Sequence, residues 1–302
     1  MRRLRPPAFG RAIETALGPG TSPGRRRSAI REALAIAQSR SWTDARAGFV
    51  WLALGRLSLG HDAEEARDAF DTFNIDLMYA LPGQTLDALR ADLDVALGYA
   101  PPHLSVYHLT MEPNTVFATR PPEGLPDEDT AAQMLDLIVE ATGAAGLQRY
   151  EVSAFARPGH RCRHNLNYWQ FGDYLGIGAG AHGKLSFPHR VLRQVRWREP
   201  ATYMDRALNG QAVSNEHEVA RRDLPFEYVL NALRLREGFA LKDFCARTGL
   251  PPSALANAAT KAHQRGLIDA EGWLEHQRVM PTPRGFDFLS DLQALFLPPS
   301  AS

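Results

Sequence analysis

Between residues 73 and 156, short apolar runs alternate with longer amphipathic runs, and this alternation constrains the fold most strongly. Strands are expected at residues 73–83, 103–112 and 149–156, where β-branched and aromatic residues gather. Helices are expected at residues 85–100 and 127–147, where apolar residues recur every three or four positions. Strands that alternate with helices at this spacing predict an α/β fold with a parallel sheet. Polar residues just past each strand are then the first candidates for a binding site.

After about residue 221 the pattern becomes mostly helical. Helices are expected at residues 224–239, 241–250, 252–268 and 285–296, with a hairpin turn at residues 270–272. This order resembles a winged helix, a module that often binds DNA. Residues 221–302 nevertheless contain ten basic and nine acidic residues, a balance that disfavours DNA binding. We expect no nucleic-acid partner and a structural or protein-contact role.

The first 50 residues differ from the remainder. They contain ten Arg and three acidic residues and show weak periodicity. We expect an atypical Arg-rich leader that is poorly ordered, while a nucleic-acid arm, a targeting peptide or a genuine part of the domain stay open. The predicted domains are therefore residues 1–50, 51–220 and 221–302.

Composition narrows the function classes. The 302 residues are 44% hydrophobic and 23% charged, which is typical of a soluble globular protein. No apolar window approaches the roughly 18 residues of a membrane span, and no secretory signal is visible. Cys162 and Cys245 are the only cysteines, so a disulfide framework is not expected and a cytoplasmic location is.

Two polar features stand out. Asp76 falls in the middle of an apolar strand, where a carboxylate needs a ligand or neighbouring backbone N–H groups. The run HNLNYW at residues 164–169 places one histidine, two amides and two aromatics within six positions. On spacing alone, the simpler interpretation of His164 is a structural histidine packed on Trp169.

Several runs carry a resemblance that extends over roughly residues 52–302. They are ALGR, FNIDLMYALPGQT, LSVYHLTMEPNT, YEVSAFARPGHRCRHNLNYW, FGDYLGIGAGAH and FEYVLNALRLREGF. The chain resembles the oxygen-independent coproporphyrinogen III oxidase-like radical SAM family, and within it the haem-chaperone branch. HNLNYW looks like the HNxxYW signature of that branch.

The resemblance implies a partial β/α barrel of the radical SAM type followed by a winged-helix-like C-terminal domain. It implies S-adenosylmethionine (SAM) at the strand ends and haem elsewhere. Arg56, Asp76 and Thr110 look like residues that line the SAM pocket, which groups near His182 would close.

For haem, the resemblance raises His164 to the candidate iron ligand, because haem iron accepts an axial imidazole. Tyr168 and Trp169 would face the porphyrin, and Asn165 and Asn167 would hold the ring or the loop. Weaker candidates as ligands are Cys162, His160, His182 and His189.

The chain departs from the family in one respect. It has no CxxxCxxC loop, and such loops supply the thiolates of a [4Fe–4S] cluster. We therefore expect a chain that begins about halfway into the barrel, performs no radical catalysis, and exposes the strand at residues 75–80 as an open edge.

The predicted function is haem binding and delivery to haem-accepting proteins, such as respiratory-chain components or other membrane-associated acceptors, with a dimer left open. The first alternative is a radical SAM enzyme of porphyrin biosynthesis whose cluster-binding N-terminus is missing from this chain. The second is an inert remnant of a damaged gene.

Overall fold

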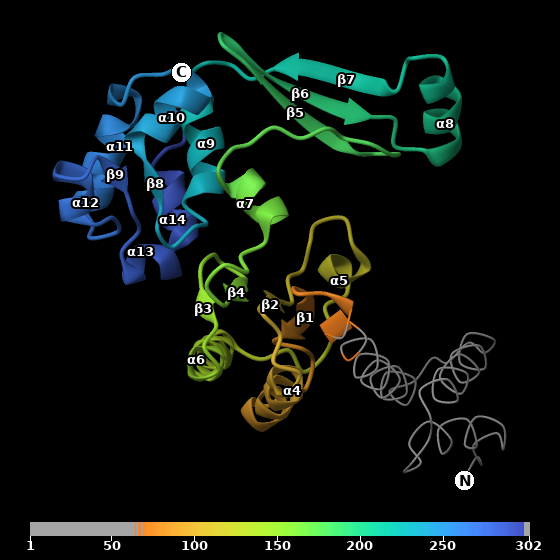
Figure 1. Cartoon of the computed structure of the whole chain (residues 1–302), viewed down its shortest axis with the longest axis vertical. Helices are drawn as coiled ribbons and strands as arrows, with labels where there is room; N and C mark the ends of the chain where they lie inside the picture. The colour runs from red at the N-terminus through yellow and green to blue at the C-terminus, as the bar shows by residue number, and fades with distance from the viewer. Residues whose placement is uncertain (1–63, 65, 68, 299–302) are drawn as a thin grey trace. The chain divides into compact units, whose positions relative to one another are not determined.

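The structure is a computed structural model, and it describes residues 64, 66–67 and 69–298 (Figure 1). The predicted leader at residues 1–50 and Arg56 lie outside the described residues. The chain divides into two compact units. Of the described residues, one unit contains residues 87–102 with those up to Ile75, and the other contains residues 76–86 and 103–298.

The first unit contains the amphipathic helix α4 (Leu86–Gly98), which confirms the helix expected at residues 85–100. Its buried residues, Leu89, Leu93 and Ala96, follow one another at spacings of four and three. That spacing places them on one face of the helix, as the leucine pattern predicts.

A four-stranded sheet has the order β1-β2-β4-β3. Its strands are β1 (Asn74–Tyr79), β2 (His103–His108), β3 (Gln148–Arg149) and β4 (Ala154–Ala156). Strand β4 runs antiparallel to both β2 and β3, so the prediction of a parallel sheet is wrong for these pairs. The strand expected at residues 149–156 is in fact two short strands joined by a tight reversal.

Local hydrogen bonds explain this reversal. The Ser153 N–H donates to Glu151 Oε1 at 3.1 Å, and the Arg149 guanidinium donates to the Val152 carbonyl oxygen at 2.8 Å. Side chains that bond to nearby backbone groups in this way stabilise a turn in competition with an extended strand. The apolar pattern of RYEVSAFA does not record these bonds.

Among the residues that the structure describes, strand β1 lies at one edge of this sheet. Its side chains alternate, with Ile75 and Tyr79 buried and Asp76 exposed. The two-residue period of a strand turns Asp76 to the exposed face, where its charge acts on His103.

Helix α6 (Glu128–Ala144) confirms the helix expected at residues 127–147. Asp127 caps it by accepting a hydrogen bond from the Thr130 N–H at 2.8 Å. Met134 and Ile138 are buried one turn apart. A four-residue helix, α5 (Val116–Thr119), precedes it.

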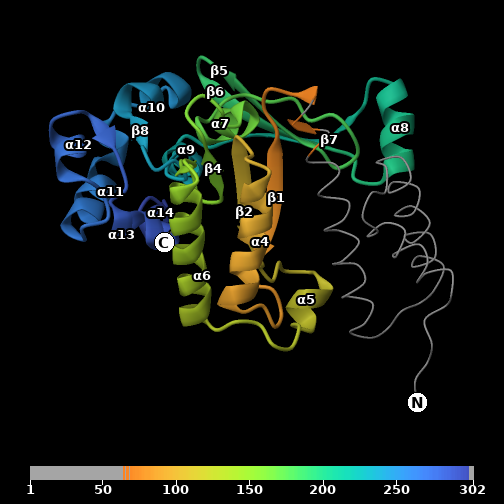
Figure 2. The ribbon, with the colours of Figure 1, turned by 60° about the horizontal axis from the view of Figure 1, so that its bottom comes forward.

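A separate antiparallel sheet consists of β5 (His182–Phe187), β6 (Arg190–Arg196) and β7 (Val213–Glu218), with helix α8 (Pro200–Leu208) between β6 and β7 (Figure 2). Strand expectations from the sequence stop at residue 156 and do not include it. Polar and charged residues dominate these strands, so the apolar signal that marks β1 and β2 is weak here.

The C-terminal part is mostly helical. It contains α9 (Leu224–Ala232), β8 (Phe239–Ala240), α10 (Leu241–Thr248), α11 (Ser253–Gln264), α12 (Ala270–Leu274), β9 (Arg278–Val279), α13 (Pro283–Asp287) and α14 (Leu289–Ala294). One apolar core unites them, with Tyr228, Phe244, Leu255 and Val279 among its most buried members. The four predicted helices therefore exist, although the first is shorter and the last is divided at Phe288.

The hairpin turn expected at residues 270–272 is wrong, because those residues begin helix α12. Asp269 caps this helix by accepting a hydrogen bond from the Gly272 N–H, at 2.6 Å. The segments on either side of α12 still pair antiparallel at Ile268 and Pro281. The helix therefore occupies the place where a tight turn was expected. Among the described residues, no helix is both long and apolar enough to cross a membrane.

Candidate functional site

The HNLNYW run is helical. Helix α7 (Arg163–Trp169) follows β4 and contacts α9. The chain turns away sharply at Phe171, which has a φ of 55°. The next residue is Gly172, where a Cβ atom would lie 2.0 Å from Asn167 Oδ1 and 2.7 Å from the Asn167 carbonyl oxygen. The close return of the chain to Asn167 therefore requires a glycine at position 172.

His164 lies on the exposed side of α7. Its ring meets the Tyr168 ring edge to face, with centroids 4.9 Å apart and planes at 68°. No hydrogen bond or ion pair engages its nitrogens within the part of the chain that the structure describes. The imidazole is therefore accessible to an external ligand, and it does not pack as a sealed structural histidine.

Two tyrosines extend this exposed side. The Tyr168 and Tyr174 ring centroids lie 4.4 Å apart. The Tyr174 hydroxyl accepts a hydrogen bond from Arg193 Nη1 at 2.8 Å, and Arg193 also pairs with Glu227 of α9. His164, Tyr168 and Tyr174 thus form a row of rings whose far end is anchored to the second sheet and to α9.

A buried lysine fixes the chain after α7. Lys184 exposes only 1% of its surface, and its Nζ donates to the Phe171 carbonyl oxygen, Asp173 Oδ1 and Ser186 Oγ at 2.8–3.0 Å. Burial lowers the pKa of Lys184, opposed by the Asp173 carboxylate. Burial also disfavours the Asp173 carboxylate, but hydrogen bonds from Ser186 and Lys184 outweigh it and lower the Asp173 pKa. Asn167 Nδ2 donates to the Asp173 carbonyl oxygen at 3.0 Å, which ties this network back to α7.

Trp169 faces a different environment from His164. The Arg234 guanidinium lies 4.3 Å from its ring centroid, and Arg234 Nη2 is 3.6 Å from the buried carboxylate of Glu151. Burial raises the pKa of Glu151, and Arg234 opposes this shift. Glu151 Oε2, Trp169 Nε1 and Arg234 Nε are buried without hydrogen-bond partners among the described residues. Trp169 therefore anchors α7 to Arg234.

A second buried link leads to the start of α7. The His103 Nε2 and Tyr150 hydroxyl atoms are 2.9 Å apart, and the same hydroxyl accepts a hydrogen bond from the Cys162 N–H at 3.3 Å. Burial raises the pKa of Tyr150 to about 12. Burial also lowers the pKa of His103, although the Asp76 charge opposes this shift.

The residues of this chain do not fit a [4Fe–4S] cluster. Such clusters are held by several thiolates, and Cys162 and Cys245 are the only thiols in the sequence. Both are free and lie on different elements. In the described part of the chain, no group of three or more His, Cys, Asp or Glu side chains could hold a metal ion.

The predicted SAM residues lie on separate elements. Asp76 is on β1, Thr110 follows β2 and donates to Glu112 Oε1 at 3.1 Å, and His182 begins β5 and is exposed. Arg56 lies outside the described residues. The SAM pocket stays a prediction.

Sequence reasoning missed Lys184, Arg193, Arg234 and the His103–Tyr150 pair. The sequence did contain one sign that Lys184 is unusual. Only three of the 34 basic residues are lysines, and this one lies between a glycine and a leucine, where a charged side chain is unexpected. The others contact partners far along the chain, which no local pattern reveals.

Comparisons with known proteins show which proteins this chain is similar to. The HemN C-terminal domain matches residues 219–288. The "Heme chaperone HemW" of Haemophilus influenzae is 42% identical over 255 residues, which cover 81% of this chain and 64% of that protein. The protein of the same name from Escherichia coli is 41% identical, covering 81% and 65%. The chain thus spans a little under two thirds of the length of these relatives.

A solved structure has a similar fold. It is described as "Coproporphyrinogen III oxidase (HemN) from Escherichia coli is a Radical SAM enzyme", with a TM-score of 0.60 and 16% identity over 94% of this chain and 61% of the other. At this identity the likeness concerns the fold alone. The chain is therefore a homologue of the HemW haem chaperones that carries a HemN C-terminal domain on a HemN-like fold.

Proposed function

We propose that this chain binds haem through His164 and passes it to haem-accepting proteins. The observation that carries the proposal is the exposed imidazole of His164, whose nitrogens are not engaged by any residue that the structure describes. Haem iron takes an axial imidazole, and tyrosine rings suit an apolar macrocycle. The printed names of the relatives support the same function.

The neighbouring residues would have distinct roles. Tyr168 and Tyr174 supply aromatic surface beside His164. Asn167, Asp173 and Lys184 keep the end of α7 and Tyr174 in place. Trp169 packs against Arg234 and so holds the end of α7 in place. Asn165 is a candidate contact of the bound haem. Bound haem would supply the iron centre that is delivered.

An exposed ligand suits a carrier. A buried haem pocket holds its cofactor through many contacts, whereas a single imidazole on the surface allows transfer to a tighter site. The proposed acceptors include respiratory-chain proteins. We also propose that the chain consists of a partial β/α barrel and a winged-helix-like C-terminal domain. The order α9, β8, α10, α11, α12, β9, with β8 paired to β9, supports the winged-helix-like domain.

Haemin titration tests the ligand. The wild-type chain should give a shifted Soret band that saturates, and the His164→Ala variant should lose most of it. His189→Ala is the matched control, because His189 is also exposed but lies outside α7. An unchanged spectrum in His164→Ala, or an equal loss in both variants, would contradict the proposal.

A further inference from the structure

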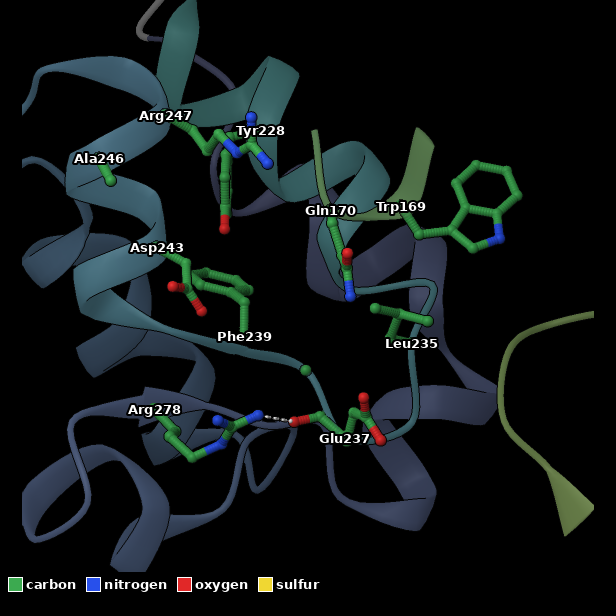
Figure 3. A pocket seen from close by; sticks show the side chains of 11 residues that line it. Trp169, Gln170, Tyr228, Leu235, Glu237, Phe239, Asp243, Ala246, Arg247 and Arg278 are labelled. Carbon is green, nitrogen blue, oxygen red and sulfur yellow. Dashed lines mark hydrogen bonds between the residues drawn. The ribbon is translucent and has the colours of Figure 1, made fainter. Parts of the chain in front are cut away.

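A cavity lies beside the C-terminal end of α7, bounded by α9, α10 and the chain around β8 (Figure 3). Its volume is about 620 Å³, and small-molecule sites are typically about 300–1,000 Å³. His164 is not among the residues that line it. These residues are Trp169, Gln170, Tyr228, Leu235, Glu237, Gly238, Phe239, Asp243, Ala246, Arg247 and Arg278.

Tyr228 provides the main clue. It exposes only 1% of its surface, yet its hydroxyl points into the cavity and has no hydrogen-bond partner among the described residues. Phe239 and Phe244 pack against its ring, with centroids 5.0 and 5.3 Å away, so the ring is held in place. The ring is buried, but the hydroxyl opens into the cavity, where a ligand can hydrogen-bond to it in place of solvent.

Two opposite charges accompany this hydroxyl. Asp243 and Arg247 lie one turn apart on α10, but no ion pair joins them or engages either with another described residue. Of the other charged residues in the lining, Glu237 is ion-paired, whereas Arg278 is hydrogen-bonded only to a backbone carbonyl. Arg278 Nη2 donates to the Glu237 carbonyl oxygen at 2.8 Å, and the Glu237 carboxylate pairs with Arg161 at 2.8 Å. The carboxylate of Asp243 and the guanidinium of Arg247, both on exposed residues, therefore remain for a ligand, with the Arg278 guanidinium beside them.

We propose that this cavity binds a free α-amino acid with an apolar side chain. Its carboxylate pairs with Arg247, its ammonium group pairs with Asp243, and the Tyr228 hydroxyl completes the polar contacts. Leu235 and Phe239 supply apolar surface for its side chain. A simple anion would leave Asp243 facing a like charge, and a simple cation would face Arg247, so the lining favours a zwitterion.

Isothermal titration of the full chain with L-leucine tests the ligand class. L-leucinamide lacks the carboxylate and 4-methylpentanoate lacks the ammonium group. We expect saturable binding of leucine at one site and at least tenfold weaker binding of each analogue. No saturable binding of leucine would overturn the proposal, and so would equal affinity for leucine and either analogue.

Variants locate the site. Tyr228→Phe removes only the hydroxyl and keeps the packed ring, and Arg247→Gln removes the guanidinium. Each should weaken leucine binding at least tenfold. Lys242→Gln is the matched control, because Lys242 is exposed on the same helix but does not line the cavity. Wild-type affinity in Arg247→Gln, or in a folded Tyr228→Phe, would contradict the assignment.

The site is independent of haem. His164→Ala should retain leucine binding, and Arg247→Gln should retain the Soret shift of the wild-type chain. Loss of haem binding in His164→Ala without loss of leucine binding keeps the two proposals separate.

Discussion

Most side chains around α7 hold the helix in place, and one, His164, stays available to bind a ligand. Asn167 and Trp169 engage other parts of the chain, whereas His164 offers its ring nitrogens to solvent. The HNLNYW run predicted His164 as a candidate from its sequence alone. It could not predict that Trp169 stacks on Arg234, because Arg234 lies 65 positions later and meets it only in the fold.

Arg234 should contribute to stability through Glu151. The Arg234→Met variant leaves a buried carboxylate without its cation. We expect a loss of about 2 kcal/mol, less than for a fully buried pair, because 30% of the Arg234 side chain is exposed. Urea denaturation measures this loss. Adding Glu151→Gln to Arg234→Met should recover part of it, and a further loss of similar size would contradict the pairing.

His103 should make stability depend on pH. Burial lowers its pKa below 6.5, so the unfolded chain binds a proton more readily than the folded chain as the pH falls through that range. The free energy of unfolding should therefore fall from roughly pH 7.5 to pH 5.5. Urea denaturation across this range should show a shallower slope for His103→Gln. Identical slopes would show that His103 does not carry the effect.

The turn after α7 depends on Gly172. A methyl group at this position would clash with both the side chain and the backbone of Asn167, so Gly172→Ala should displace the end of the helix. We expect haem affinity to fall by about tenfold, the equivalent of about 1.4 kcal/mol. Haemin titration gives the affinity.

Gly143→Ala is the matched control for this substitution. Gly143 lies in α6, and a Cβ there would meet nothing within 4 Å. It should leave haem affinity unchanged and stabilise the chain by about 0.5–1 kcal/mol, because alanine favours a helix. Equal effects of the two substitutions would contradict the role of Gly172.

Helices and strands that carry local sequence signals, such as caps and regularly spaced apolar residues, were predictable. Helix α6 has a capping aspartate, acidic residues in its first turn and regularly spaced apolar residues, and each signal is local. Residues 149–156 and 270–272 were mispredicted because the side chains of Glu151 and Asp269 redirect the backbone by accepting hydrogen bonds from the N–H groups of Ser153 and Gly272. The strands β5–β7 were missed because their pairing, and not their apolar content, defines them.

At the scale of the whole molecule, the sequence predicted the family and the helical C-terminal part. It did not predict the antiparallel pairing of β4, since this depends on which strands become neighbours. The bonds around Lys184 likewise arise only when β5 meets the chain after α7.

Haem binding should stabilise the whole chain. A ligand that binds only the folded state, at a free concentration of one hundred times its Kd, adds about 2.7 kcal/mol. Thermal or urea denaturation with and without haemin should show this gain in the wild-type chain and not in His164→Ala. An equal gain in both would indicate that haem binds elsewhere.

Rescue by free imidazole tests the central claim most directly. The His164→Gly variant should lose the Soret band of the haem complex, and added imidazole should restore it by replacing the missing side chain at the iron. His189→Gly should bind haem like the wild-type chain without any added imidazole. A wild-type spectrum in His164→Gly without imidazole would show that His164 does not bind the iron.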